Sequence, residues 1–118
     1  MKKETIPFSD WENLDIRVGK ILDAESIENA DKLYNLTVDL GKEIGKRTIV
    51  AGLKQHYSQE ELKGKKCLVL ANLEPKKLKG IESQGMILAA INEDENGETK
   101  SIKIISPESE VEEGSKVR

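Results

Sequence analysis

The sequence predicts an all-β domain in which five short strands close into a small barrel, with one helix between the third and fourth strands. Alternating apolar and polar residues predict the strands, because successive side chains of a strand point to opposite faces. A capping sequence in the middle of the chain predicts the helix. Aromatic residues make up only 3% of the 118 residues, so aliphatic side chains must fill the interior. No repeat or flexible linker divides the chain, and residues 1–118 are expected to form a single domain.

The first half of the chain predicts three strands. They are expected over Asp15–Ile27, Tyr34–Gly41 and Arg47–Ala51. The second is the clearest, because Leu36, Val38 and Leu40 alternate with polar residues. Gly19, inside the first strand, predicts a bulge or a bend there. The turn between the first two strands is expected at Asn29–Lys32.

The second half of the chain predicts the helix and the remaining strands. Ser58 and Glu61 have the spacing of a capping box, in which each side chain bonds the other residue's backbone N–H. The strands are expected over Lys66–Asn72, Gly85–Ile91 and Ser101–Ser106. Five of these strands are taken as the main ones, and five short strands with one helix between the third and fourth describe an OB-fold barrel, with additions at both ends.

Both ends of the chain add short segments to the predicted barrel. Ser9 and Glu12 have the spacing of a second capping box and predict a helical turn near the N-terminus. Trp11 in that turn is expected to cover one end of the core. The C-terminal stretch 107–118 is acidic and only weakly patterned.

Charge is distributed unevenly along the chain. The formal net charge is −3, which by itself argues against a nucleic-acid-binding protein. Residues 42–90, however, hold ten basic and five acidic residues, whereas the segments on either side each have a net charge of −4. Such a basic middle segment is a candidate site for a polyanion, although lysines also keep strand edges soluble.

Composition also limits the compartment and the chemistry. No apolar stretch is long enough to cross a membrane, and none follows the N-terminus as in a secretory signal. The single cysteine, Cys67, cannot form an internal disulfide, so the cytoplasm is the expected compartment. His56 is the only histidine, and no residues have the spacing of a metal site, a nucleophile–base pair or a phosphate-binding loop. We therefore expect neither an enzyme nor a cofactor.

The most informative segment is 72–86, which joins two predicted strands. Lys76, Lys77 and Lys79 lie in a loop built around Pro75 and Gly80, where they can present ammonium groups to phosphates. Polar and small residues follow, and a hydroxyl or an amide can bond phosphate, ribose or base edges. Spacing alone favours Met86 as an ordinary core residue.

At these residues the chain resembles the tRNA-binding OB-fold domains found at the C-terminus of methionyl-tRNA synthetases and as free-standing dimeric tRNA-binding proteins. The matching stretches are Leu14–Ile21, Asn29–Tyr34, Arg47–Leu53, the Asn72-Leu73-x-Pro75-x-Lys77 pattern and the Gly80-Ile81-x-Ser83-Gln84-Gly85-Met86 pattern. They occur in the family's order over most of the chain.

The resemblance implies a non-catalytic module that binds tRNA and assists an aminoacyl-tRNA synthetase in protein biosynthesis. Its Ser-x-x-Met element, which the family uses for tRNA contact, carries over to Ser83 and Met86. The candidate RNA-binding residues are Lys32, Arg47, Lys54, Asn72, Lys76, Lys77, Lys79, Ser83, Gln84 and Met86. Family members dimerise through terminal additions, which here match Ile6–Leu14 and Ile102–Val117, so a homodimer is expected.

Two matters stay open at this point. The chain resembles a free-standing member or a synthetase β-type subunit that pairs with a methionyl-tRNA synthetase catalytic chain, but a segment of a longer synthetase would have the same sequence. A protein-interaction or chaperone-like OB-fold dimer with little specific RNA binding is the alternative function. Because few aromatic residues are present for stacking, recognition of folded tRNA by shape and backbone is favoured over base stacking.

Overall fold

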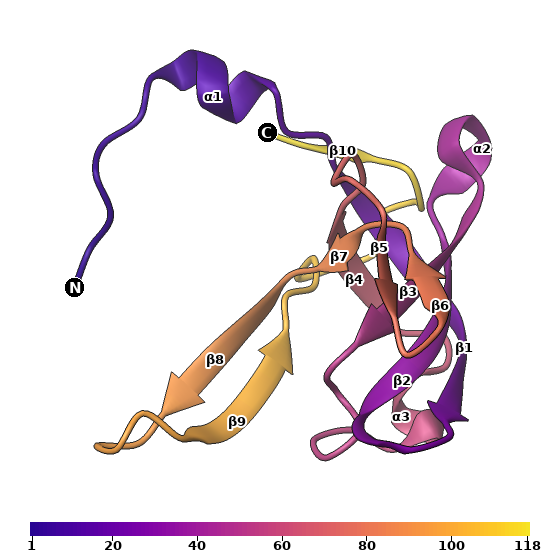
Figure 1. Ribbon diagram of the computed structural model, residues 1–118. Coiled ribbons are helices and arrows are strands. Elements are labelled where there is room, and N and C mark those ends of the chain that lie inside the picture. Colours follow the sequence, from indigo (N-terminus) through magenta and orange to yellow (C-terminus); the bar gives the residue numbers. More distant parts are fainter.

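The computed structural model describes residues 1–118 as a mostly β structure (Figure 1). The strands are Ile16–Ile27 (β1), Ala30–Asp39 (β2), Lys46–Ala51 (β3), Lys66–Leu70 (β4), Lys76–Leu78 (β5), Ile81–Ser83 (β6), Met86–Ile87 (β7), Ala89–Glu93 (β8), Thr99–Ile104 (β9) and Lys116–Val117 (β10). The helices are Phe8–Glu12 (α1), Gly41–Ile44 (α2) and Gln59–Leu62 (α3). None of these helices has the length and apolar character needed to span a membrane.

One antiparallel sheet in the order β3-β2-β1-β4-β7 organises the molecule, and its long strand β1 belongs to both halves. The first part of β1, from Ile16 to Lys20, pairs with β4, whereas the part from Lys20 to Ile27 pairs with β2. The register of the β1–β2 pair shifts between Ile21 and Asp23 and again between Ser26 and Ile27, whereas Gly19 pairs with Cys67 in a regular ladder, so no bulge lies at Gly19. This arrangement lets the sheet curl around one core.

The predicted continuous barrel is not present as a closed hydrogen-bonded sheet. The path of paired strands ends at β3 on one side and at β7 on the other, and no ladder joins these two strands. β3 nevertheless lies against β6 and β7, so the curled sheet brings its two edges near each other. What the prediction had right is a mostly β fold with α3 between β3 and β4.

The core is aliphatic, as the composition predicted. The fully buried side chains include Ile21, Leu36, Val38, Leu40, Ile49, Leu62, Cys67 and Val69. The alternation predicted for the second strand is therefore confirmed. Burial raises the pKa of the Cys67 thiol to about 12, which keeps it neutral and makes it a small apolar core residue.

The two predicted capping boxes have different outcomes. At α3, Ser58 Oγ accepts a hydrogen bond from the Glu61 amide at 3.1 Å, and Glu61 Oε1 accepts one from the Ser58 amide at 2.8 Å. At α1 the prediction is wrong, because Pro7 is the N-cap and no side chain caps the helix. Trp11 does not cover the core either: α1 has no buried residue, and 37% of Trp11 is exposed.

The single strand predicted over Gly85–Ile91 is divided into β7 and β8. The break occurs at Leu88, whose amide donates to the Leu68 carbonyl at 2.9 Å while its carbonyl accepts from the Ile105 amide at 3.0 Å. The chain thereby leaves the main sheet, and β8 pairs with β9 in a hairpin that stands away from it (Figure 1). An unbroken apolar run carries no period that could mark such a change of partner.

The acidic C-terminal segment is held against the sheet by two basic residues. Lys66 Nζ lies 3.0 Å from carboxylate oxygens of Glu110 and of Glu113. Burial of Lys66 lowers the pKa of its ammonium, but the two carboxylates outweigh this effect and leave the pKa raised. Further along, the Gly114 amide donates to the Val18 carbonyl at 2.8 Å.

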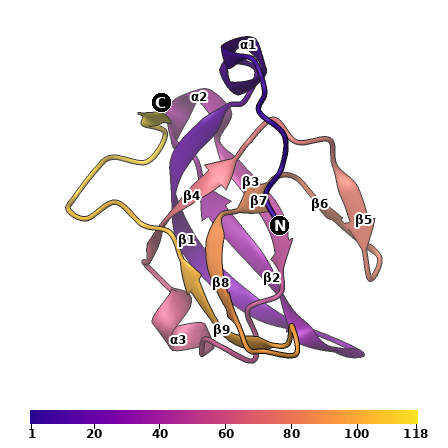
Figure 2. The same cartoon turned by 90° about the vertical axis from the view of Figure 1, so that its left-hand side faces the viewer.

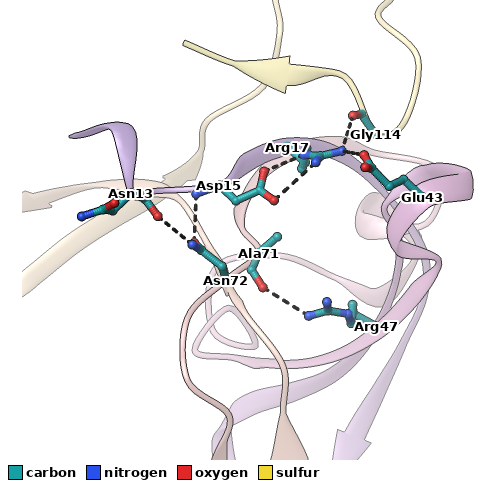
Figure 3. A network of polar contacts seen from close by, with 8 residues as sticks. All are labelled: Asn13, Asp15, Arg17, Glu43, Arg47, Ala71, Asn72 and Gly114. Carbon is teal, nitrogen blue, oxygen red and sulfur yellow. Dashed lines mark hydrogen bonds and ion pairs between the residues drawn. The ribbon is translucent and has the colours of Figure 1, made fainter. Parts of the chain in front are cut away.

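The second basic residue, Arg17, is almost fully buried, with 6% of its surface exposed. Its Nε donates to Asp15 Oδ1 at 2.6 Å, and its Nη1 donates to Glu43 Oε1 at 2.8 Å and to the Gly114 carbonyl at 3.2 Å (Figure 3). The hydrogen bonds with Asp15 and then Glu43 raise the pKa of Arg17. One guanidinium thus joins β1, α2 and the C-terminal segment, which continues into β10.

Gly19 is required by close packing, and we expect Gly19→Ala to destabilise the fold. A Cβ at this position would lie 2.7 Å from Val38 Cγ1 and 2.9 Å from Leu40 Cδ2. Overpacking of this kind costs about 1–3 kcal/mol, which urea denaturation would measure. Gly52→Ala is the matched control, because its nearest neighbour, the Lys32 carbonyl, would be 3.9 Å away. Equal stability of the two variants would contradict this account.

Candidate nucleic-acid interface

The segment that was predicted to be a lysine-bearing loop is a β-hairpin. In the ladder between β5 and β6, Lys76 is opposite Ser83 and Leu78 is opposite Ile81. Lys79 and Gly80 therefore form a two-residue turn. Both have positive φ angles, 50° and 80°, as a type I′ turn requires. Lys76, Lys77 and Lys79 are all exposed. The hairpin gives these three lysines a fixed frame that a loop would lack.

Ser83 and the residue after it attach this hairpin to the edge of the main sheet. Ser83 is buried, with 6% exposed, and its Oγ accepts a hydrogen bond from the Val50 amide at 2.9 Å. The Gln84 amide donates to the Thr48 carbonyl at 2.8 Å. Two amide groups are therefore satisfied along the boundary between β3 and β6, and the Ser83 hydroxyl faces the protein rather than the solvent.

Two further candidate residues use their polar atoms within the framework (Figure 3). Arg47 Nη1 donates to the Ala71 and Gln84 carbonyls, both at 3.2 Å. Asn72 Oδ1 accepts from the Asp15 amide at 2.9 Å, and its Nδ2 donates to the Asn13 carbonyl at 2.7 Å. Both side chains therefore connect segments of the chain that are distant in sequence.

The hairpin turn comes close to the turn between β1 and β2. A hollow of about 350 Å³ lies there, lined by Asn29, Ala30, Asp31, Lys32, Leu33 and Lys79. The Lys54 amide donates to the Lys32 carbonyl at 3.2 Å, which places Lys54 beside the same turn. The structure therefore brings Lys32, Lys54 and Lys79 together although they are far apart in sequence. We call these three residues with Lys76 and Lys77 the lysine cluster.

The last two candidate residues lie where the chain passes from β6 to β7. Gln84 is half-buried, and its Nε2 lies 3.4 Å from Glu82 Oε1. Met86 pairs with Leu70 in the ladder between β4 and β7, and 52% of it is exposed. The expectation that Met86 fills the core is therefore wrong, and its side chain is open to solvent.

The lysine cluster and the acidic C-terminal segment occupy different sides of the molecule. In Figure 2 the β5–β6 hairpin stands on one side of the sheet, and the chain between β9 and β10 loops out on the opposite side. Two acidic residues, Asp31 and Glu82, also lie beside the lysine cluster. Only part of the positive surplus of residues 42–90 is gathered beside the β1–β2 turn, because Lys42 in α2, Lys46 at the start of β3 and Lys63 after α3 are also exposed.

Sequence reasoning missed two residues of this region, Asn29 and Asp31. Asn29 has a φ of 62° at the β1–β2 turn, and Asp31 is exposed at the start of β2. The turn signal at Asn29–Lys32 was present in the sequence, but only the fold places it next to the β5–β6 turn. The structure also contains no group of three or more His, Cys, Asp or Glu residues that could hold a metal ion.

The sequence and the fold of this chain are similar to those of known proteins. Residues 16–116 match the family model described as "Putative tRNA binding domain". The chain belongs to the tRNA-binding domain family. Over 115 residues it is 52% identical to a methionine–tRNA ligase of Pyrococcus horikoshii and 50% identical to one of Porphyromonas gingivalis. Each of these matches covers 98% of this chain. It spans only 15% and 16% of these relatives.

Two solved structures match this chain over almost all of its length. A structure described as a MetRS-related protein from Pyrococcus horikoshii has a TM-score of 0.83 and 37% identity, and the match covers 98% of this chain and 100% of that one. A structure described as the chaperone CsaA from Bacillus anthracis has the same TM-score and coverage at 26% identity. Tertiary structure is therefore shared between the synthetase-related and chaperone-named members.

We expect Ser83→Ala to destabilise the protein, because it leaves the buried Val50 amide without a partner. An unsatisfied buried donor costs about 1–3 kcal/mol, which chemical denaturation can detect. Ser9→Ala is the matched control, because no Ser9 side-chain hydrogen bond caps α1. Equal destabilisation of both variants would show that the Ser83 hydroxyl does not hold the hairpin.

Proposed function

We propose that this chain is a non-catalytic tRNA-binding module with an OB-fold, formed by residues 1–118 as one domain. The OB-fold is supported by the curled sheet, by the sharing of β1 between its two halves, and by α3 between β3 and β4. In OB-folds, nucleic acids bind over the second and third strands and the loops beside them. The lysine cluster occupies this position here.

The observation that carries the proposal is the anchored lysine hairpin. Flexible ammonium groups on a fixed frame suit phosphates, which supply most of the affinity in nucleic-acid complexes. Lys76, Lys77 and Lys79 are proposed as direct contacts, together with Lys32 and Lys54. Arg47, Asn72 and Ser83 are proposed to act by holding the frame, while Gln84 and Met86 complete the surface at its edge.

The placement of the aromatic residues supports recognition of a folded RNA by its shape. Tyr34 and Tyr57 are joined by a 2.8 Å hydrogen bond from the Tyr34 hydroxyl to the Tyr57 carbonyl and pack with the core. Phe8 and Trp11 belong to the N-terminal arm. No aromatic side chain therefore lines the hollow beside the lysine cluster, so this surface lacks the stacking platforms on which a run of single-stranded bases would bind. Phosphates and 2′-hydroxyls of a folded tRNA fit this surface.

The proposed role is to assist a methionyl-tRNA synthetase. The relatives that match are named as that enzyme, and the matched region is a small part of their length. A module that binds tRNA near a synthetase raises the local concentration of tRNA at the catalytic site.

The decisive test measures the affinity for whole tRNA, a minihelix and an unstructured RNA of equal length at two or more salt concentrations. We expect whole tRNA to bind best. Changing Lys76, Lys77 and Lys79 to alanine should weaken binding, because fewer phosphates are then neutralised. The slope of the logarithm of the binding constant against the logarithm of the salt concentration should fall in magnitude by about one for each phosphate that a lysine no longer contacts.

The control for this experiment replaces three lysines on other parts of the surface, Lys63, Lys100 and Lys103, with alanine. It removes the same charge and should leave the salt slope nearly unchanged. Equal affinity for all three RNAs would reject shape recognition. Absence of RNA binding together with salt-resistant binding of unfolded chains would favour the chaperone-like alternative.

We further propose that the molecule is a homodimer built on its N-terminal arm. Phe8 is 69% exposed, and with Trp11, Leu14 and Val117 it supplies the apolar part of a groove of about 620 Å³ between α1 and β10, whose remaining lining residues are mostly polar or charged. Uncovered apolar surface of this kind is typical of an interface. A dimer would also present two lysine clusters to one tRNA, with a gain in avidity if both are reached.

Changing Phe8 and Trp11 together to serine is expected to convert a dimer to a monomer in sedimentation at micromolar concentration. The side chains of α1 are not buried in one copy, so the fold of each chain should survive. Leu22→Ser, an exposed position on β1, is the control and should leave the assembly state unchanged. A wild-type monomer at this concentration would contradict the proposal.

A further inference from the structure

The hollow between the β1–β2 and β5–β6 turns has an unusual backbone. Only two residues other than glycine have positive φ angles in this structure, Asn29 at 62° and Lys79 at 50°, and both line this hollow. Lys79 occupies the first central position of its type I′ turn, where Asn, Asp or Gly is strongly preferred. A lysine at this position is therefore less favourable for the turn than any of these residues, and its side chain lines the hollow.

The chemistry of the hollow is mixed in a way that fits one kind of ligand. Ala30 and Leu33 supply apolar surface, and Ala30 is buried. Lys32 and Lys79 supply positive charge, whereas Asn29 and Asp31 supply a side-chain amide and a carboxylate. A bare anion would be opposed by Asp31. A ligand with a phosphate, a flat apolar face and amino groups at its edge would use all four kinds of lining.

The size of the hollow sets a further limit. A volume of about 350 Å³ lies at the lower end of the range for sites that take small ligands. A base inside a helical stack has both faces covered by its neighbours, so it could not lie against the apolar lining of the hollow. An unpaired nucleotide of an RNA can be splayed out and read on its edges.

We infer that this hollow is a subsite for a single unpaired nucleotide of the bound RNA. Lys32 and Lys79 hold its phosphate, Leu33 lies against the base, and Asn29 with Asp31 bond the amino edge. Asp accepts hydrogen bonds from the amino group of cytosine, and Asn pairs with adenine. Bases with an exocyclic amino group are therefore preferred over uracil. This inference rests on the proposed RNA-binding function and adds a site that reads a base.

The first test uses Asn29→Gly, which removes the amide but keeps a residue suited to positive φ. Binding of tRNA should weaken about five- to tenfold, while binding of a fully paired RNA duplex stays within twofold of wild type. Asn96→Gly, the same change in the turn between β8 and β9, should alter neither affinity. An equal decrease for tRNA and duplex, or no decrease for tRNA, would overturn the subsite.

The second test adds free nucleotides to the wild-type protein and follows its backbone amides by NMR. Cytidine and adenosine monophosphates should give saturable shifts at Asn29, Lys32 and Lys79, and uridine monophosphate should bind more weakly. The same shifts with inorganic phosphate, or none with any nucleotide, would reject base reading. If wild-type protein binds no tRNA at low salt, the proposed function itself fails, so the two failures are distinguishable.

Discussion

The hydrogen bond from the Val50 amide to the Ser83 hydroxyl is the contact on which the placement of the β5–β6 hairpin depends. It lies where β3 has no further strand partner, and together with the bond from the Gln84 amide to the Thr48 carbonyl it draws β6 along that edge. The sheet itself stays open between β3 and β7. A few bonds near residue 83 therefore do what a full ladder would do in a closed barrel, and they fix the direction of the hairpin.

Polar side chains of this region form two groups: those that bond the protein backbone and those that are exposed to solvent. Arg47, Asn72 and Ser83 bond backbone groups of distant segments, and Arg17 does the same at the start of β1. The lysine cluster instead keeps its ammonium groups in solvent, where they can exchange water and counterions for phosphates. A rigid frame with mobile charges on it tolerates variation in the exact path of an RNA backbone.

Much of the fold could be predicted from local pattern, but the site could be predicted only in part. The alternation around Val38 and the capping box at Ser58 are local signals, and both gave the right element. The capping box at Ser9 failed because spacing does not reveal that Pro7 would begin the helix. The lysines were recognisable by type, whereas the roles of Arg47 and Ser83 were not, because their partners, Gln84 and Val50, lie far away in sequence.

The clamped C-terminal segment has an electrostatic consequence for the whole molecule. Lys66 and Arg17 hold Glu110, Glu113 and their neighbours in place on one side, while the hairpin carries its lysines on the other (Figure 2). Charges fixed in this way contribute to an electric dipole whose positive end is at the hairpin. A polyanion at a distance exerts a torque on such a dipole and turns the lysine side toward itself before contact. A net charge of −3 is then compatible with rapid, oriented encounter with RNA.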